Sequence, residues 1–351
     1  MLIIPATLQW YLGGFYESGW VMIWSFLAPL GALVFRGEKE AGLWFLGFLL
    51  MVIASVILDP ILVKPKERSQ WMLTVFLIMN IGFVSSIVYY TILYNINKTK
   101  IEHQKSEELL TKILPEKIAK ELKERGETMP LFYKSATVLF TDFVGFTKMS
   151  EKMKPAELIY ELENCFTRFD DAGKRFKIEK LKTIGDAYMC AAGLPERTKT
   201  HAIDACLFGL EIQKIINELK IEKEKEGKPF WRLRLGIHSG PVVAGVIGKN
   251  KIAYDIWGDT VNTASRMESS GQEGMVNISK VTYDLVKDFF EFENRGKVTA
   301  KSKGEVDMYF VIGIKKNLSD DENGEIPNDL FWKMYEEVGS KKPKREKLKV
   351  A

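Results

Sequence analysis

The sequence predicts an α+β fold, with helices on one face of a sheet, preceded by an α-helical membrane region. Three observations support this prediction. Residues 1–97 are mostly apolar, whereas the remainder is rich in Lys and Glu. Beyond residue 130, β-branched runs and segments of helical periodicity alternate as strand, helix, two strands, helix and strand. The first of these strands, residues 136–140, is followed closely by an aspartate and a glycine turn.

Composition divides the 351 residues into four parts. We assign residues 1–97 to the membrane region, 98–130 to a helical linker, 131–315 to a folded domain and 316–351 to a charged tail. The net charge of +4 is too small to indicate nucleic-acid binding. The cysteines have no metal-type spacing, so we expect reduced core residues at Cys165, Cys190 and Cys206.

Residues 19–35, 41–58 and 69–97 are uncharged, and each stretch is about as long as a membrane span needs. Aromatic residues typical of the membrane interface lie in or near their ends: Trp20, Trp24, Trp44, Trp71, Tyr89, Tyr90 and Tyr94. Buried helices of a soluble core are the weaker interpretation of three such runs so close together. We therefore predict about three transmembrane helices in a multi-pass protein of the cell membrane.

The linker, residues 98–130, is charged and has helical periodicity. Ser106 followed by two glutamates is a helix-start signal, and Pro115 predicts an end or a kink. The linker is either a short parallel coiled coil that joins two copies of the chain or a solvated connector helix. We favour the coiled coil, for a reason that comes from the expected active site.

Two aspartates lie at the ends of predicted strands. Asp142 follows the strand at 136–140, and a helical pattern begins after Gly145. Asp186 lies between β-rich runs at 176–184 and 187–192, which predict a hairpin with the acid at its tip. A lone aspartate at a strand end is usually a turn or cap residue, but two of them could bridge a pair of metal ions beside phosphates. Spacing alone leaves the function open.

Further along the chain, residues 231–238 and 242–247 predict two strands split by Ser239, Gly240 and Pro241. His238 lies in this hairpin-like motif, where a structural role is the better interpretation. In the tail, four apolar residues could pack as one helix on the domain: Leu330, Phe331, Trp332 and Tyr335.

Four segments together resemble the catalytic domain of class III nucleotidyl cyclases: VLFTDFVGFT, KLKTIGDAYMCAAG, RLGIHSGPVVAGVIG and YDIWGDTVNTASRMESSG. They occur in the family's order within about residues 131–314, and the apolar N-terminal part resembles the membrane regions of bacterial members. The resemblance implies a ferredoxin-like domain and a membrane-bound adenylate cyclase that converts ATP to 3′,5′-cyclic AMP and pyrophosphate. It also places that domain in the cytoplasm, because the reaction needs cytosolic nucleotide.

The resemblance implies roles for residues around the phosphates. Asp142 and Asp186 match the family's metal-binding aspartates, and the Phe143 carbonyl would be a further ligand of two Mg²⁺ or Mn²⁺ ions per site. The β- and γ-phosphates would face backbone N–H groups around Gly145, Phe146 and Thr147. Further phosphate contacts are expected at Arg234 and at Lys301, whose register with Lys303 stays open.

Lys182 and Asp255 match the pair that binds the purine edge in adenylate cyclases. Adenine offers a ring nitrogen that accepts a hydrogen bond from Lys and an amine that donates one to Asp. Guanine has a carbonyl in place of that amine, and guanylate cyclases typically carry Glu and Cys at these positions. The resemblance therefore implies ATP rather than GTP as the substrate.

Asn262 and Arg266 match the family's ribose-orienting asparagine and the arginine that stabilises charge on the α-phosphate. The implied reaction is intramolecular attack of the ribose 3′-oxygen on the α-phosphorus. Family members build each site between two catalytic domains, and this chain carries both halves. We therefore expect a head-to-tail homodimer, which is the reason for favouring a coiled-coil linker.

Three alternatives were weighed against a membrane-bound adenylate cyclase. The nearest is a guanylate cyclase. A membrane receptor whose cyclase-like domain only binds nucleotide belongs to another class, and it need not keep the four residues Asp142, Asp186, Asn262 and Arg266. A diguanylate cyclase or polymerase palm is disfavoured, because its motif context is absent from the sequence.

Overall fold

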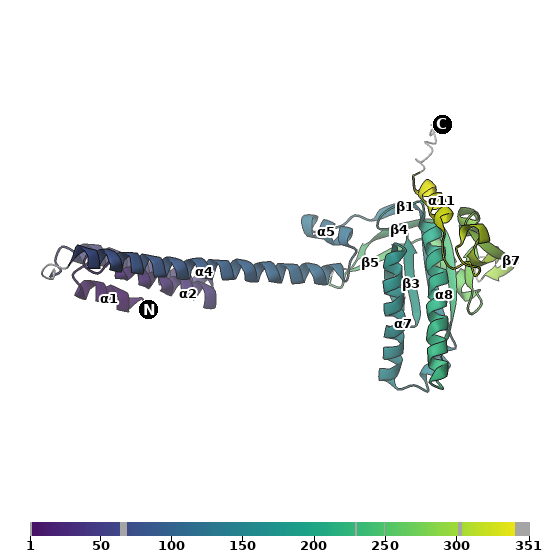
Figure 1. Cartoon of the computed structure of the whole chain (residues 1–351), viewed down its shortest axis with the longest axis horizontal. Helices are drawn as coiled ribbons and strands as arrows, with labels where there is room; N and C mark the ends of the chain where they lie inside the picture. The colour runs from purple at the N-terminus through teal and green to yellow at the C-terminus, as the bar shows by residue number, and fades with distance from the viewer. Residues whose placement is uncertain (1, 64–68, 229, 249, 301–303, 341–351) are drawn as a thin grey trace. The chain divides into compact units, whose positions relative to one another are not determined.

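The computed structural model describes residues 2–63, 69–228, 230–248, 250–300 and 304–340. The chain divides into two compact units, Met1–Glu108 and Leu109–Ala351. Each unit is described by itself below, with the element labels of Figure 1.

The first unit is helical. Its elements are α1 (Ile3–Tyr11), the 3₁₀ helix η1 (Val21–Phe26), α2 (Leu27–Phe35), α3 (Glu38–Leu58) and α4 (Gln70–Thr111). Two of them, α3 and α4, are long and apolar enough to cross a membrane, and only 11% of each apolar window is buried. Such exposed apolar helices are unlike the core helices of a soluble protein.

The predicted stretch 19–35 is not one long helix. It is divided into η1 and α2, after a left-handed residue at Trp20 (φ 63°). The described part of the chain therefore has two candidate spans plus a shorter apolar segment, rather than about three spans. Side-chain hydrogen bonds join the early residues to the long helices: Trp10 Nε1 donates to Ser55 Oγ (2.7 Å) and Trp24 Nε1 to Asn80 Oδ1 (2.9 Å).

The linker differs from the prediction at its start and agrees with it at Pro115. The helix α4 continues without a break through Ser106 to Thr111 (Figure 1). Inside a continuous helix the backbone N–H groups are bonded to carbonyls of the preceding turn, so Ser106 has no free N–H groups to cap. Pro115 then precedes α5 (Glu116–Arg125), with ψ of 140°, as its N-cap residue. The expected interruption at Pro115 is thus confirmed.

The second unit contains an eight-stranded sheet in the order β2-β3-β1-β4-β6-β8-β7, with β5 paired to β4. The strands are β1 (Leu131–Val144), β2 (Ile178–Ile184), β3 (Ala187–Ala192), β4 (Arg232–Ile247), β5 (Ala253–Trp257), β6 (Val276–Ser279), β7 (Phe290–Ala300) and β8 (Gly304–Ile314). The β4–β6 pair is parallel, and the other pairs are antiparallel.

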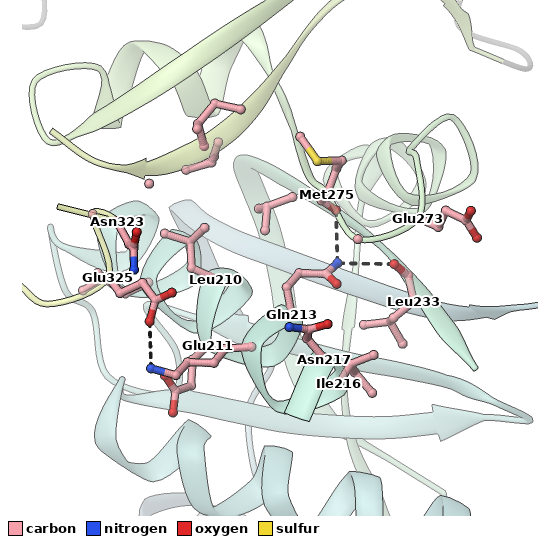
Figure 2. A pocket seen from close by; sticks show the side chains of 18 of the residues that line it. Leu210, Glu211, Gln213, Ile216, Asn217, Leu233, Glu273, Met275, Asn323 and Glu325 are labelled. Carbon is pink, nitrogen blue, oxygen red and sulfur yellow. Dashed lines mark hydrogen bonds and ion pairs between the residues drawn. The ribbon is translucent and has the colours of Figure 1, made fainter. Parts of the chain in front are cut away.

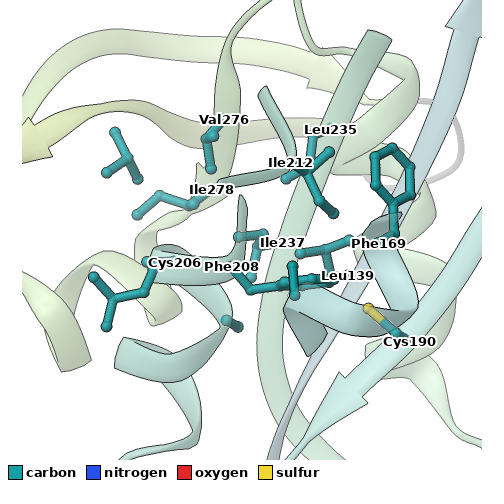
Figure 3. Packing of buried hydrophobic residues seen from close by; sticks show 14 of the residues in the cluster. Leu139, Phe169, Cys190, Cys206, Phe208, Ile212, Leu235, Ile237, Val276 and Ile278 are labelled. Carbon is teal, nitrogen blue, oxygen red and sulfur yellow. The ribbon is translucent and has the colours of Figure 1, made fainter. Parts of the chain in front are cut away.

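Helices cover both faces of this sheet. On one face, α7 (Pro155–Arg175), α8 (His201–Lys225) and α10 (Lys280–Val286) enclose the larger core, where Phe169 and Phe208 pack with Leu139 and Ile237 (Figure 3). On the other face, α5 and α9 (Asp259–Ser269) pack against the alternate side chains of β1 and β4. The expectation of helices on one face only is therefore wrong.

The close approach of α9 depends on Gly236 of β4. A Cβ at this position would lie 1.8 Å from the backbone nitrogen of Glu268. Because Gly236 has no side chain, the backbone of α9 can lie directly on β4. A sequence pattern does not reveal this backbone contact.

The strand β4 is continuous, where two strands were predicted. Its pairing with β1 passes through Gly240 (opposite Ala136), and the irregularity falls on β1 between Tyr133 and Ala136. Pro241, which has no N–H to donate, lies beside this irregularity and does not end the strand.

The residues after β8 form part of the folded unit. They include η2 (Lys316–Leu318) and α11 (Asp329–Ser340), whose Phe331 is fully buried against Phe289 and Phe290. Tyr335 donates its hydroxyl proton to Asp204 on α8 (2.7 Å). The expected helix thus packs on the domain, and the three cysteines are free and buried as expected.

Candidate active site

The two predicted metal ligands lie on neighbouring segments of the sheet. Asp142 belongs to β1, and Asp186 follows Gly185 in the two-residue turn between β2 and β3, next to β1. Gly185 has a φ of +64°, a conformation that a tight hairpin turn needs and glycine adopts freely. The two carboxyl groups interact electrostatically.

Electrostatics at this pair favour a bound cation. Burial raises the pKa of Asp186, the negative charge of Asp142 raises it further, and backbone N–H groups of Asp186 and Phe143 oppose the rise. Two hard carboxylates and a carbonyl oxygen are ligands that suit Mg²⁺ or Mn²⁺. Among the described residues, no group of three or more His, Cys, Asp or Glu side chains is arranged to hold a metal ion, so further ligands would be backbone, water or phosphate oxygens.

Arg234 already places a cation beside Asp142. It lies opposite Asp142 in the β1–β4 register, and its Nη2 donates to Asp142 Oδ2 over 2.6 Å. Its Nε lies 3.2 Å from Glu268 Oε1, so the guanidinium joins carboxylates from β1 and α9. The predicted phosphate contact thus lies beside one of the predicted metal ligands.

Glu268 was missed by the sequence analysis. Its side chain is only 11% exposed. Burial raises its pKa to about 7, the charge of Asp142 adds to the rise, and Arg234 opposes it. The signal that could have found it is an acidic residue on the buried side of the NTASRMES helix, where acids are rarely left without a partner.

The predicted base-recognition residues also come together. Lys182 of β2 and Asp255 of β5 form an ion pair through Nζ and Oδ2. The Asp255 side chain is 15% exposed and that of Lys182 is 43% exposed, so the pair lies at the surface of a partly sheltered site. Asp255 Oδ1 also accepts a hydrogen bond from the backbone N–H of Ile256, which orients the carboxylate.

Asn262 and Arg266 lie four residues apart on α9, as predicted. Asn262 is exposed and Arg266 is half-buried, whereas Ala264 and Met267 face the sheet. Within the described residues, no hydrogen bond or ion pair links either side chain to Asp142 or Asp186.

The predicted phosphate loop connects β1 to the short helix α6 (Phe146–Ser150). Gly145 precedes the helix with a φ of +74° and makes no side-chain cap. The first N–H groups of the helix, at Phe146 and Thr147, have no acceptor within it. Lys301 and Lys303 lie outside the described residues.

His238 has a structural environment, as predicted. Its Nδ1 lies 2.7 Å from the Ser279 hydroxyl at the start of α10. A second histidine, His201, lies 2.6 Å through its Nδ1 from the Thr137 hydroxyl, and burial lowers its pKa to about 4.

A cavity of about 590 Å³ lies elsewhere, between α8, the strands β6 and β8, and residues 323–327. Figure 2 shows Gln213 in its wall, donating to the backbone carbonyls of Leu233 and Met275. Lys214 and Glu325 form an ion pair at 2.8 Å. None of the predicted site residues lines this cavity, so it is distinct from the candidate active site.

Comparison with protein families gives a match over residues 131–313 to the adenylate and guanylate cyclase catalytic domain. The chain belongs to the class III cyclase family. It is 33% identical over 334 residues to adenylate cyclases of Mycobacterium bovis and Mycobacterium tuberculosis, an alignment that covers 90% of this chain and 74% of each relative. The predicted resemblance and fold class are thereby confirmed.

Other cyclase relatives match the catalytic part. Human atrial natriuretic peptide receptor 2 is 40% identical over 219 residues, which cover 61% of this chain and 21% of the receptor. The guanylate cyclase domain of RhGC from Catenaria anguillulae, solved with GTP, is 36% identical (TM-score 0.50) and covers 53% of this chain and 100% of its own. Adenylyl cyclase CyaB from P. aeruginosa is 28% identical (TM-score 0.51; 55% and 100% covered).

Proposed function

We propose that this cyclase is a membrane-bound adenylate cyclase that converts ATP to 3′,5′-cyclic AMP and pyrophosphate. The observation that supports the proposal is the pairing of Lys182 with Asp255 at the surface of a partly sheltered site. A lysine donates to the ring nitrogen of adenine, and an aspartate accepts from its exocyclic amine. Guanine would set its carbonyl against the aspartate, leaving buried polar groups unpaired.

The phosphate end of ATP would lie at the β1–β3 edge. There, Asp142 and Asp186, with the Phe143 carbonyl, would hold two Mg²⁺ or Mn²⁺ ions. When bound, such ions supply positive charge that activates the attacking oxygen and stabilises the leaving pyrophosphate. The free N–H groups after Gly145 are suited to the β- and γ-phosphates, as is the guanidinium of Arg234.

The bond-making step needs orientation and charge rather than a protein nucleophile. The ribose 3′-oxygen attacks the α-phosphorus, a bond to that phosphorus forms, and the bond to pyrophosphate breaks. Asn262 would orient the ribose, and Arg266 would donate to the α-phosphate as negative charge develops. Both residues share one side of α9.

We infer that two copies of the chain build each site. The basis is the family resemblance, because class III cyclases build each site between two catalytic domains and this chain carries the residues of both halves. A head-to-tail homodimer with two equivalent sites meets this requirement. A monomer should then be inactive, and the helix α4 with its charged end is suited to keep two chains together.

The membrane assignment rests on α3 and α4. Their apolar side chains are exposed in the structure, and lipid would cover them. The catalytic domain would face the cytoplasm, where ATP is available, in a multi-pass protein.

The test is to incubate the purified full-length protein with Mn²⁺ and either ATP or GTP, and to quantify both cyclic nucleotides. Asp142→Ala is the inactive control. Cyclic AMP as the main product supports the proposal, and cyclic GMP as the main product would reassign the protein as a guanylate cyclase. If neither product forms while nucleotide still binds, the domain is a silent nucleotide-binding module.

A further inference from the structure

Arg234 holds a central position among the acids of the candidate site. Its guanidinium contacts Asp142 at 2.6 Å and Glu268 at 3.2 Å, and all three side chains are at least two-thirds buried. Asp186 faces the same group of charges from the β2–β3 turn. Arg234 thus contacts two carboxyl groups of the candidate site, and Asp186 adds a further negative charge that acts on Glu268.

The backbone fixes this arrangement. Arg234 and Gly236 lie two residues apart on β4, so they point to the same face of the sheet. Gly236 lets the Met267–Glu268 backbone of α9 lie directly on the strand, and the Glu268 carboxyl group reaches Arg234 from there. The cross-strand register sets Asp142 on the opposite side of the guanidinium.

A divalent cation at Asp142 and an arginine at Asp142 use the same negative charge. A metal ion bound by Asp142 would compete with the guanidinium for that carboxylate. Glu268 is the remaining carboxylate that contacts Arg234. It can therefore keep the guanidinium near the phosphates after Asp142 has been taken by metal.

We propose that Glu268 is a positioning residue for Arg234. The carboxylate of Glu268 shares the guanidinium with Asp142, so that metal can displace Arg234 from Asp142 without releasing it from the site. This inference rests on the proposed metal-dependent function. In this role Glu268 would act through Arg234.

The decisive experiment is a double-mutant cycle on Mn²⁺ affinity. Four full-length proteins in detergent are compared without nucleotide: wild type, Glu268→Gln, Arg234→Met and the double variant. Free Mn²⁺ is measured by electron paramagnetic resonance. The matched control is Glu273→Gln, which removes the carboxylate of the exposed Arg232–Glu273 pair from the same strand end.

We expect Glu268→Gln to weaken Mn²⁺ binding about tenfold, because the guanidinium then pairs with Asp142 alone. Arg234→Met should strengthen binding, since it removes the competing charge. In the Arg234→Met background, Glu268→Gln should have almost no effect. Glu268→Asp should recover part of the wild-type affinity, and the Glu273→Gln control should bind as wild type does.

If Glu268→Gln weakens binding by the same factor with and without Arg234, the glutamate acts directly on the metal or on the fold, and the inference is wrong. Wild-type protein that binds no Mn²⁺ would instead refute the proposed metal-dependent function. In that case thermal unfolding of the same four proteins without metal tests the contact, and additive shifts in Tm would refute it.

Discussion

Lys182 and Asp255 form an ion pair within one chain, although they come from β2, at the edge of the sheet, and from β5, which pairs with β4. Each residue is an ion-pair partner of the other. The pair therefore fixes two hydrogen-bonding groups, a donor and an acceptor, at the place proposed for the purine.

Replacing this pair should change the base that is used. We expect Lys182→Glu combined with Asp255→Cys to lower kcat/KM for ATP by roughly 100-fold or more, because the new groups no longer match adenine. Cyclic GMP should become detectable. Both products are measured by chromatography for each single variant and for the double variant. An unchanged preference for ATP in the double variant would show that other residues choose the base.

Asp186→Asn should remove Mn²⁺-dependent activity while raising the metal-free stability at pH 7. The pKa of Asp186 is raised by burial and by Asp142, so its carboxylate form is unfavourable in the folded protein. The stability that this group gives is present at low pH and is lost as the pH rises through its folded pKa. We expect a Tm gain of about 2–4 °C at pH 7.

That gain should shrink as the pH falls from the raised folded pKa of Asp186 towards the ordinary aspartate value, and it should vanish below that value, where the wild-type carboxyl group is protonated in both states. Thermal unfolding of both proteins across pH 3–8 (about one unit per step) in a chelating buffer measures the difference. A constant difference across this range would show that charge is not its cause.

His201 should make the protein sensitive to acid. Burial lowers its pKa from 6.5 to about 4, so between these values the unfolded chain binds a proton that the folded chain does not. The stability from the neutral ring is present above 6.5 and is lost as the pH falls towards 4. One pKa unit corresponds to about 1.4 kcal/mol, so about 3 kcal/mol of unfolding free energy depends on the protonation of His201.

His201→Asn keeps a polar atom near the Thr137 hydroxyl but cannot take up the proton. The difference in unfolding free energy between wild type and variant, followed from pH 7 to pH 4, isolates the histidine from the titrating carboxyl groups. The variant should lose less stability on acidification. Parallel curves for the two proteins would contradict the prediction.

Gly236→Ala should push α9 away from β4. The added Cβ would meet backbone atoms of Met267 and Glu268, which cannot move aside as a side chain can. We expect a loss of about 2–4 kcal/mol in unfolding free energy and a strong fall in activity. Gly173→Ala is the control, because its new Cβ would be at ordinary contact distances of 3.6–3.8 Å. Equal stability of the two variants would refute the close contact.

Phe331→Ala should show that α11 stabilises the catalytic unit. Phe331 is fully buried against Phe289 and Phe290, so its truncation leaves a cavity. We expect the free energy of unfolding to fall by about 3–5 kcal/mol. Leu330→Ala, at a residue 47% exposed, is the matched control and should cost less than about 1 kcal/mol. Denaturant unfolding of both variants measures the difference. A negligible effect at Phe331 would mean that α11 is dispensable.

Much of the site was predictable because its residues lie in local patterns. The turn glycine and the acids at strand ends point to Asp142 and Asp186, and the motif order identified the family before any contact was known. Helical spacing put Asn262 and Arg266 on one side of α9. The strands around Asp186 were correctly expected to form a hairpin, because a Gly-Asp turn between β-branched runs is a local signal.

The sequence by itself determined the apolar N-terminal part, the α+β class and the chemical character of each half of the site. Only the tertiary structure decided that β4 is one strand, that α9 covers the second face, and that Glu268 holds Arg234 beside Asp142. The physical reason is that these features depend on backbone approach and cross-strand register. Gly236 shows this: the same glycine in a strand pattern could mark a bulge, and only the packed helix shows that it makes room for Glu268.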